Sequence, residues 1–115
     1  MLTNLQELIN KGGEKISPIE LDNVLARHPA VSEAVSFAVP DEMYGQEVGV
    51  AIVLKPNQKL DEKELKAWVA DKLAKFKVPK KVYFTDNMPK TATGKIQRRI
   101  VADTMMKMDV PKAKL

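Results

Sequence analysis

The sequence contains no cysteine, which excludes disulfide bonds, zinc sites built on thiolates and cysteine nucleophiles. Its one histidine, His28, stands before Pro29 at the end of an expected helix, where capping or packing is favoured over metal ligation, and we predict no metal site. The longest apolar stretches are strand-sized, far below the roughly 20 residues that cross a bilayer. The first residues also lack the layout of a signal peptide. We therefore expect no membrane insertion and no secretion by that route.

Length and charge set the next limits. The 115 residues suffice for one compact domain, and hydrophobic (44%) and charged (30%) fractions are those of ordinary globular proteins. A net charge of +4 favours polyanionic partners such as nucleotides, CoA, nucleic acid or an anionic membrane surface. Because aromatic residues do not interleave the basic ones, as in base-stacking surfaces, we do not expect nucleic acid, and a solvated face is the simpler interpretation of most lysines.

The N-terminal part predicts a short hairpin followed by a helix. Gly12 and Gly13 supply the positive φ of a tight turn between strands at 6–10 and 14–17. Ser17 then caps a helix, with Pro18 at its first position and Glu20 completing a capping box. We expect the buried stripe of this helix to consist of Leu21, Val24, Leu25 and His28.

Two alternating segments predict a pair of antiparallel strands. In 31–39 the residues Val35, Phe37 and Val39 alternate with others, and in 47–54 every second residue is a valine, isoleucine or leucine. Each segment therefore suits a sheet with one buried face. The link 40–45 begins with proline and ends with glycine, so it is expected to form a loop.

Two more helices and a third core strand complete the expected fold. Asp61 and Glu64 form a capping box for a helix from 61 to about 76, and Val82 and Phe84 indicate the strand. A last helix from residue 96 carries an apolar face of Ile100, Val101 and Met105. The prediction is an α+β fold: a small antiparallel sheet of about three core strands plus an N-terminal two-stranded hairpin, flanked by about three helices.

The segment most suggestive of chemistry is the polar loop that enters this last helix, which we call the lysine loop (residues 87–95). Lys95 follows Gly94 directly, so an ammonium group stands on a flexible approach to an anion. Thr93 and Gly94 suit phosphate binding through backbone amides, with Lys95 as a point charge. The spacing is not that of a Walker loop, and by physics alone a solvated loop is an equal alternative.

Residues 89–99, Pro-Lys-Thr-Ala-Thr-Gly-Lys-Ile-Gln-Arg-Arg, resemble the C-terminal motif P-K-T-x-x-G-K-[IL]-x-R-R of acyl-CoA synthetases and their adenylate-forming relatives at every specified position. Residues 8–21 are similar to the motif that opens the small C-terminal domain of that family. Val39-Pro40-Asp41 and Tyr44-Gly45 resemble its loop between paired strands. The resemblance implies that residues 1–107 are this lid domain, whose partner is a large N-terminal adenylation domain.

The resemblance also implies the roles of individual residues in two half-reactions. Lys95 would bridge the carboxylate of the acid and the α-phosphate of ATP while the acyl-adenylate forms. After a rotation of the domain, the turn of Gly12, Gly13 and Glu14 would flank the pantetheine arm of CoA. Further family positions near the nucleotide or CoA are Lys15, Tyr44, Val78, Pro79 and Lys80.

ATP and CoA are accordingly implied as co-substrates of a full enzyme, with Mg²⁺ entering on ATP in the large domain. Because that domain is absent from this chain, we expect the chain alone to bind no cofactor and to be inactive. The family usually has G-R-x-[KD] where Thr3, Asn4, Leu5 and Gln6 stand, so the residue that serves as the hinge is replaced by Gln6.

The overall likeness is greatest to the peroxisomal oxalate–CoA ligase group, with 4-coumarate-type or fatty acid–CoA ligase lids as alternatives. A non-catalytic module that binds CoA or another polyanion also remains open. In the expected flexible tail (residues 108–115), Ala113-Lys114-Leu115 resembles the Ser-Lys-Leu peroxisomal signal. The sequence therefore predicts peroxisomal localisation through the import receptor.

Overall fold

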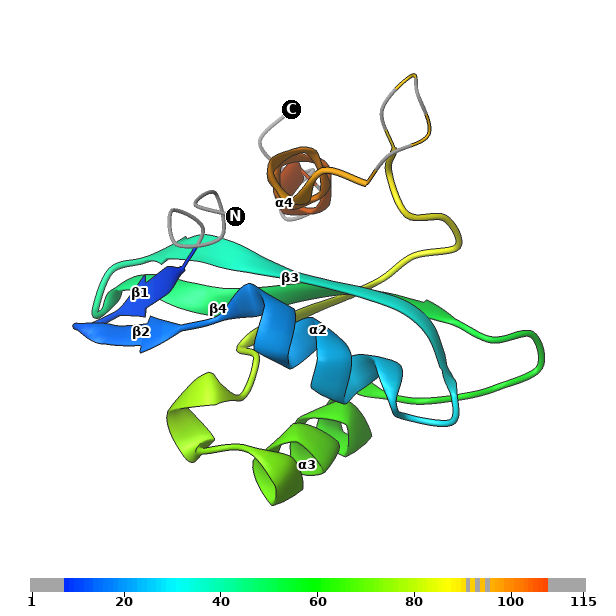
Figure 1. Ribbon diagram of the computed structural model, residues 1–115, viewed down its shortest axis with the longest axis horizontal. Coiled ribbons are helices and arrows are strands. Elements are labelled where there is room, and N and C mark those ends of the chain that lie inside the picture. Colours follow the sequence, from blue (N-terminus) through cyan, green and yellow to red (C-terminus); the bar gives the residue numbers. More distant parts are fainter. Residues whose placement is uncertain (1–7, 91, 93, 95, 108–115) are drawn as a thin grey trace, which may run out of the picture.

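The computed structural model describes residues 8–90, 92, 94 and 96–107, which form one mixed sheet with helices on both faces (Figure 1). In chain order the elements are β1 (Ile9–Lys11), β2 (Glu14–Ile16), α2 (Pro18–Ala26), β3 (Val31–Asp41), β4 (Gly45–Leu54), α3 (Glu62–Lys72), the 3₁₀ turn η1 (Lys75–Lys77), β5 (Lys81–Phe84) and α4 (Arg98–Lys107). The predicted α+β class, hairpin and three helices are confirmed. None of the helices in the described ranges has the length and apolar character required to cross a membrane.

β4 is the central strand of the sheet. Along one edge it pairs antiparallel with β3, as predicted, from Asp41↔Gly45 to Val31↔Leu54. Its other edge is shared: β1 meets it antiparallel at Lys11↔Gly45, and β5 pairs with it in parallel from Gly49 to Ile52. The direction of β5 departs from an all-antiparallel sheet because α3 and η1 form a crossover between β4 and β5.

The sheet is buried on both faces. Helices α2 and α3 cover one face and α4 covers the other (Figure 1). The α2/α3 core contains Ile9, Ile16, Leu21, Leu25, Val31, Val48, Val50, Ile52, Leu65 and Val69. The α4 core contains Val35, Phe37, Val39, Ala51, Tyr83, Met88, Val101, Ala102 and Met105. The apolar rows of β3 and β4 that suggested one buried face thus point to opposite sides of the sheet.

The predicted starts of α2 and α3 are confirmed, whereas α4 starts at Arg98 rather than at residue 96, and some ends and faces also differ. The Ser17 hydroxyl accepts from the Glu20 N–H at 3.3 Å, but the Glu20 carboxylate pairs with Lys77 and does not complete the predicted capping box, whereas Asp61 and Glu64 form theirs in full. Helix α3 stops at Lys72 rather than near residue 76, because the next residue is extended and the chain turns into η1. Three residues that were expected in the core are not part of it. His28 follows the end of α2 and is only partly buried, and Phe84 and Ile100 are exposed.

Candidate functional site

Several predicted site residues lie outside the described residues. They are Lys95, Thr91 and Thr93 of the lysine loop, the hinge position Gln6 and the terminal Ala113, Lys114 and Leu115. The segments that flank Lys95 are described, and they show how the loop is attached to the domain.

The lysine loop is anchored close to both of its ends. On the incoming side, Met88 is buried in the α4 core, while the described loop positions Lys90, Ala92 and Gly94 are exposed. Gly94 has a φ of 84°, a conformation that side-chain-bearing residues rarely adopt. On the outgoing side the chain enters α4 at Arg98. The two ends of the loop are therefore fixed by the body of the domain.

Arg98 is held by a network that joins three elements. One of its guanidinium nitrogens, Nη1, lies 2.8 Å from Asp22 Oδ2 on α2 and donates over 2.8 Å to the Ser36 carbonyl on β3. The Ser36 N–H donates to the other Asp22 oxygen at 2.6 Å. Burial raises the pKa of Asp22, although the charge and hydrogen bond of Arg98 act in the opposite direction. We call Arg98, Asp22 and Ser36 the arginine clamp.

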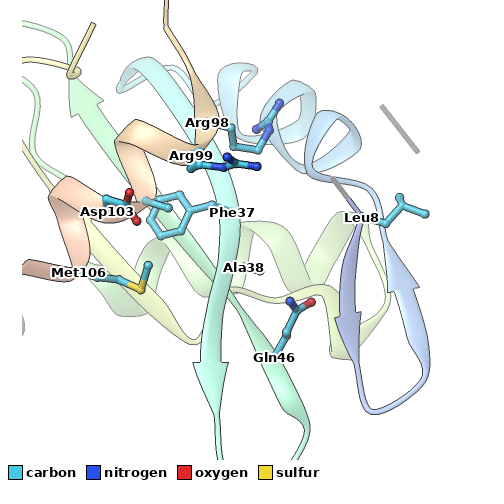
Figure 2. A pocket seen from close by; sticks show the side chains of 9 residues that line it. Leu8, Phe37, Ala38, Gln46, Arg98, Arg99, Asp103 and Met106 are labelled. Carbon is cyan, nitrogen blue, oxygen red and sulfur yellow. The ribbon is translucent and has the colours of Figure 1, made fainter. Parts of the chain in front are cut away.

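The sequence pattern did not identify the arginine clamp as a unit. Arg98 belongs to the recognised motif, but Asp22 lies far earlier in the chain, on the polar side of a helix, and Ser36 resembles any strand residue. Arg98 and its neighbour Arg99 also line a hollow of about 300 Å³ between α4 and β3 (Figure 2). Figure 2 shows Arg98 extending past β3 toward α2.

A second group of predicted residues meets at the turn between β1 and β2. Gly12 and Gly13, the glycine turn, have φ values of 57° and 97°. The Gly12 N–H donates to the Tyr44 carbonyl at 2.9 Å, and a Cβ added to Gly12 would lie 3.1 Å from Tyr44 Cδ1. The glycine turn therefore packs directly against the loop between β3 and β4, and both the positive φ and the close approach of Tyr44 favour glycine at position 12.

Lys11 links this turn to the rest of the domain. Its Nζ atom lies 3.0 Å from Glu47 Oε1, donates to the Phe76 carbonyl at 3.3 Å and stands 5.2 Å from the centre of the Tyr44 ring. The side chains of Lys11 and Glu47 are only 15% and 4% exposed, so water screens this ion pair weakly. The pair joins the hairpin, the central strand and η1 around the glycine turn.

Lys80 lies near the same loop. Its ammonium is 3.1 Å from Asp41, which also accepts the backbone N–H groups of Met43 and Tyr44. The bond from the Tyr44 N–H, followed by that from Lys80, lowers the pKa of Asp41, while the hydrogen bond to Asp41 raises the pKa of Lys80. Lys80 therefore carries its positive charge beside the loop that contacts the glycine turn.

The structure thus brings together Gly12, Tyr44 and Lys80, which the sequence predicted separately. Glu14 and Lys15 are exposed on or beside the same hairpin, free of close packing by the core. Val78 packs against the α2/α3 core, and Pro79 is buried. These two residues support the path of the chain before Lys80, and their predicted place beside CoA stays a prediction.

The ranges that the structure describes contain no preformed metal-binding site. Across residues 8–90, 92, 94 and 96–107, no group of three or more histidine, aspartate or glutamate side chains is placed to hold a metal ion. The structure instead presents two groups of residues: a glycine turn with a nearby lysine, and a loop whose described positions between Met88 and Arg98 are mostly exposed and whose ends are tied down.

Comparison with known proteins shows the family to which the chain belongs. Residues 20–95 match the family described as AMP-binding enzyme C-terminal domain. The chain is 58% identical over 96% of its length to an oxalate–CoA ligase of Saccharomyces cerevisiae, and 56% identical over 89% to one of Arabidopsis thaliana. An ATP-bound crystal structure of MatB from Rhodopseudomonas palustris superimposes with a TM-score of 0.82 and 29% identity, over 89% of this chain. The chain spans 20% of the length of each of these three proteins.

Proposed function

Since this chain belongs to the family of AMP-binding enzyme C-terminal domains, we propose that it is the mobile lid of an ATP-dependent, AMP-forming acid–CoA ligase. The observation that carries the proposal is the 58% identity to an oxalate–CoA ligase across almost the whole chain. The full enzyme would consist of this lid and a large adenylation domain that supplies the ATP and acid sites. The lid alone would not turn over.

In the first half-reaction, a carboxylate oxygen of the acid attacks the α-phosphate of ATP and pyrophosphate leaves. Lys95 stabilises the negative charge shared between these groups as an electrostatic clamp, and it does not act as a nucleophile. Removing one preorganised charge-stabilising donor of this kind typically costs about 10²–10³ in rate. The anchors at Met88 and Arg98 support this role because they tie the chain to the domain on both sides of Lys95 in the sequence.

In the second half-reaction, the thiol of CoA attacks the acyl-adenylate carbonyl and AMP leaves. The glycine turn, with Glu14 beside it, borders the pantetheine arm, since a backbone without side chains lets an extended thiol chain pass closely. Tyr44 supports the turn from behind, and Lys80 and Lys15 provide positive charge for the CoA phosphates. Mg²⁺ arrives with ATP and is held outside this lid.

Oxalate is the acid that we propose, because two relatives of more than 50% identity carry the name oxalate–CoA ligase. We also propose a peroxisomal location, because Ala113-Lys114-Leu115 resembles the peroxisomal signal. Deleting Leu115 should abolish binding of the import receptor in a fluorescence-polarisation assay with the C-terminal peptide. Unchanged affinity would contradict this part of the proposal.

The alternative function, a non-catalytic module that binds polyanions, is less well supported than the lid function, because one of the lysines that would bind the polyanion forms an ion pair within the domain. Lys77, one of the lysines between residues 77 and 81, contacts Glu20 at 2.8 Å, so its charge is paired within the domain. Binding to a DNA oligomer at low salt, falling steeply as salt is raised, would revive that alternative.

The proposal is tested with a chimera in which this chain replaces the matching fifth of the S. cerevisiae relative. We expect oxalate-dependent exchange of pyrophosphate into ATP, and a loss of about 10²-fold or more in Lys95→Ala. Thioester formation from preformed oxalyl-adenylate should persist in the same variant, because Lys95 serves the other half-reaction.

Lys90→Ala provides the control, since it removes an exposed lysine of the same loop to which no role is assigned. Equal loss of both half-reactions in Lys95→Ala would refute the assignment of Lys95 to adenylation. A folded chimera without exchange activity for any acid would refute the lid function.

A further inference from the structure

The arginine clamp occupies the free edge of the sheet. β3 is an outer strand, bonded within the sheet only to β4 among the described strands. At Ser36 its peptide N–H and C=O bond instead to Asp22 and Arg98, as they would to the peptide groups of one more strand. A carboxylate and a guanidinium thus complete the strand edge, and they do so with one residue from α2 and one from α4.

The clamp also fixes the first turn of α4. The apolar contacts of this helix come from Val101, Ala102 and Met105, while Arg99 and Ile100 in its first turn are exposed. Apolar packing therefore begins at Val101, the fourth residue of the helix. Arg98, the first residue of α4, bonds through its side chain to both α2 and β3, so it ties the beginning of the helix to these two elements ahead of the apolar contacts.

From this geometry we infer that the arginine clamp positions the lysine loop for adenylation, an inference that rests on the proposed function. Arg98 follows Lys95 by three residues, and the described part of the loop between Met88 and α4 has no helix or strand of its own. A shift at the start of α4 would therefore act on the chain only three residues after Lys95. Misplacing a reacting group by about 1 Å can cost about 10²-fold in rate. Arg98 and Asp22 are therefore positioning residues that act through Lys95.

The decisive experiment compares the two half-reactions in the same chimera, using Arg98→Met and Asp22→Asn. Either change should lower adenylate formation by about 10–100-fold and leave thioester formation from preformed oxalyl-adenylate within about threefold. The double variant should lose little more than the worse single variant, because the two residues form one unit. Arg27→Met and Asp71→Asn are matched controls at exposed positions away from α4, and both should keep full activity.

A second measurement does not depend on activity. Amide hydrogen exchange of the chain itself should accelerate at Val101, whose N–H bonds to the Gln97 carbonyl, by about tenfold in Arg98→Met. The amide of Leu73, bonded to Val69 at the end of α3, should be unchanged. Faster exchange at both sites, or equal loss of both half-reactions, would show general destabilisation and overturn the inference.

The two proposals fail in different ways. If the unaltered chimera forms no adenylate, the lid function is refuted, and the local exchange at Val101 still decides whether the clamp fixes the start of α4. If the chimera is active and Arg98→Met forms adenylate at the normal rate, the positioning role is refuted and the lid function stands.

Discussion

The two regions to which we assign the two half-reactions are attached to the domain in different ways. The glycine turn is part of the sheet: β1 carries it, Tyr44 backs it, and the buried Lys11–Glu47 pair ties it to the central strand. The lysine loop lies between a buried methionine and a helix whose first turn is held by a polar clamp. The glycine turn is therefore part of the sheet, whereas the lysine loop is attached to the domain only at its two ends, by Met88 and Arg98.

This difference matches the chemistry expected of each region. A channel for pantetheine must keep its shape, which suits backbone held by strand pairing and close contacts. A lysine that enters the active site in one half-reaction and leaves it in the other needs an exposed loop with a defined base. The contrast predicts that variants in the two regions will differ in how stability and activity are affected.

The largest effect is expected from Glu47→Gln, which removes the ion pair that ties the glycine turn to the central strand. It leaves the ammonium of Lys11 without its charged partner in a site of low exposure, at a cost of about 2–3 kcal/mol in unfolding free energy. Chemical denaturation monitored by Trp68 fluorescence would measure this change. Glu62→Gln, in the more exposed pair with Lys66, should cost less than about 0.5 kcal/mol. Equal effects of the two changes would mean that the Lys11–Glu47 pair does not stabilise the region.

A smaller loss of stability is expected from Gly12→Ala, which tests the contact between the glycine turn and Tyr44. The positive φ costs about 1 kcal/mol, and the new methyl group displaces the Tyr44 ring. In Gly13→Ala no atom lies within 4 Å of the new methyl group, so that variant reports the cost of a positive φ without a steric contact. In the chimera, Gly12→Ala should slow thioester formation about tenfold and spare adenylation. Slower adenylation with unchanged thioester formation would reverse our assignment of the regions.

The smallest effect concerns pH, for which the two regions should respond with opposite sign. The raised pKa of Asp22 means that the folded state binds its proton more tightly, so this stabilisation is complete at low pH and is lost as pH rises above about 4. The lowered pKa of Asp41 stabilises the fold at higher pH, and that contribution disappears as pH falls below about 4. Denaturation of Asp22→Asn and Asp41→Asn between pH 3 and 6 should give differences from wild type that slope in opposite directions. Parallel slopes would contradict this assignment.

Local signals were sufficient for most element starts. Ser17 and Asp61 cap their helices because an N-cap needs only nearby backbone N–H groups, and the glycine turn follows from positive φ. The helix end near residue 76 was wrong because the apolar spacing continues into η1, where Phe76 and Val78 still pack against the core although α3 has ended. Apolar periodicity reports burial, and burial does not require a continuous helix.

The α+β class, the lysine loop and the family could be inferred from the sequence alone, because they depend on short-range patterns and on a motif of eleven residues. Three features emerged only when the chain was folded: both faces of the sheet are buried, Gly12 meets Tyr44 with Lys80 beside the same loop, and Asp22 and Arg98 close the edge of β3. They were not predictable because the residues involved are far apart along the chain. Asp22 and Arg98 become neighbours only when α2 and α4 have packed around the same strand, and no local pattern encodes that meeting.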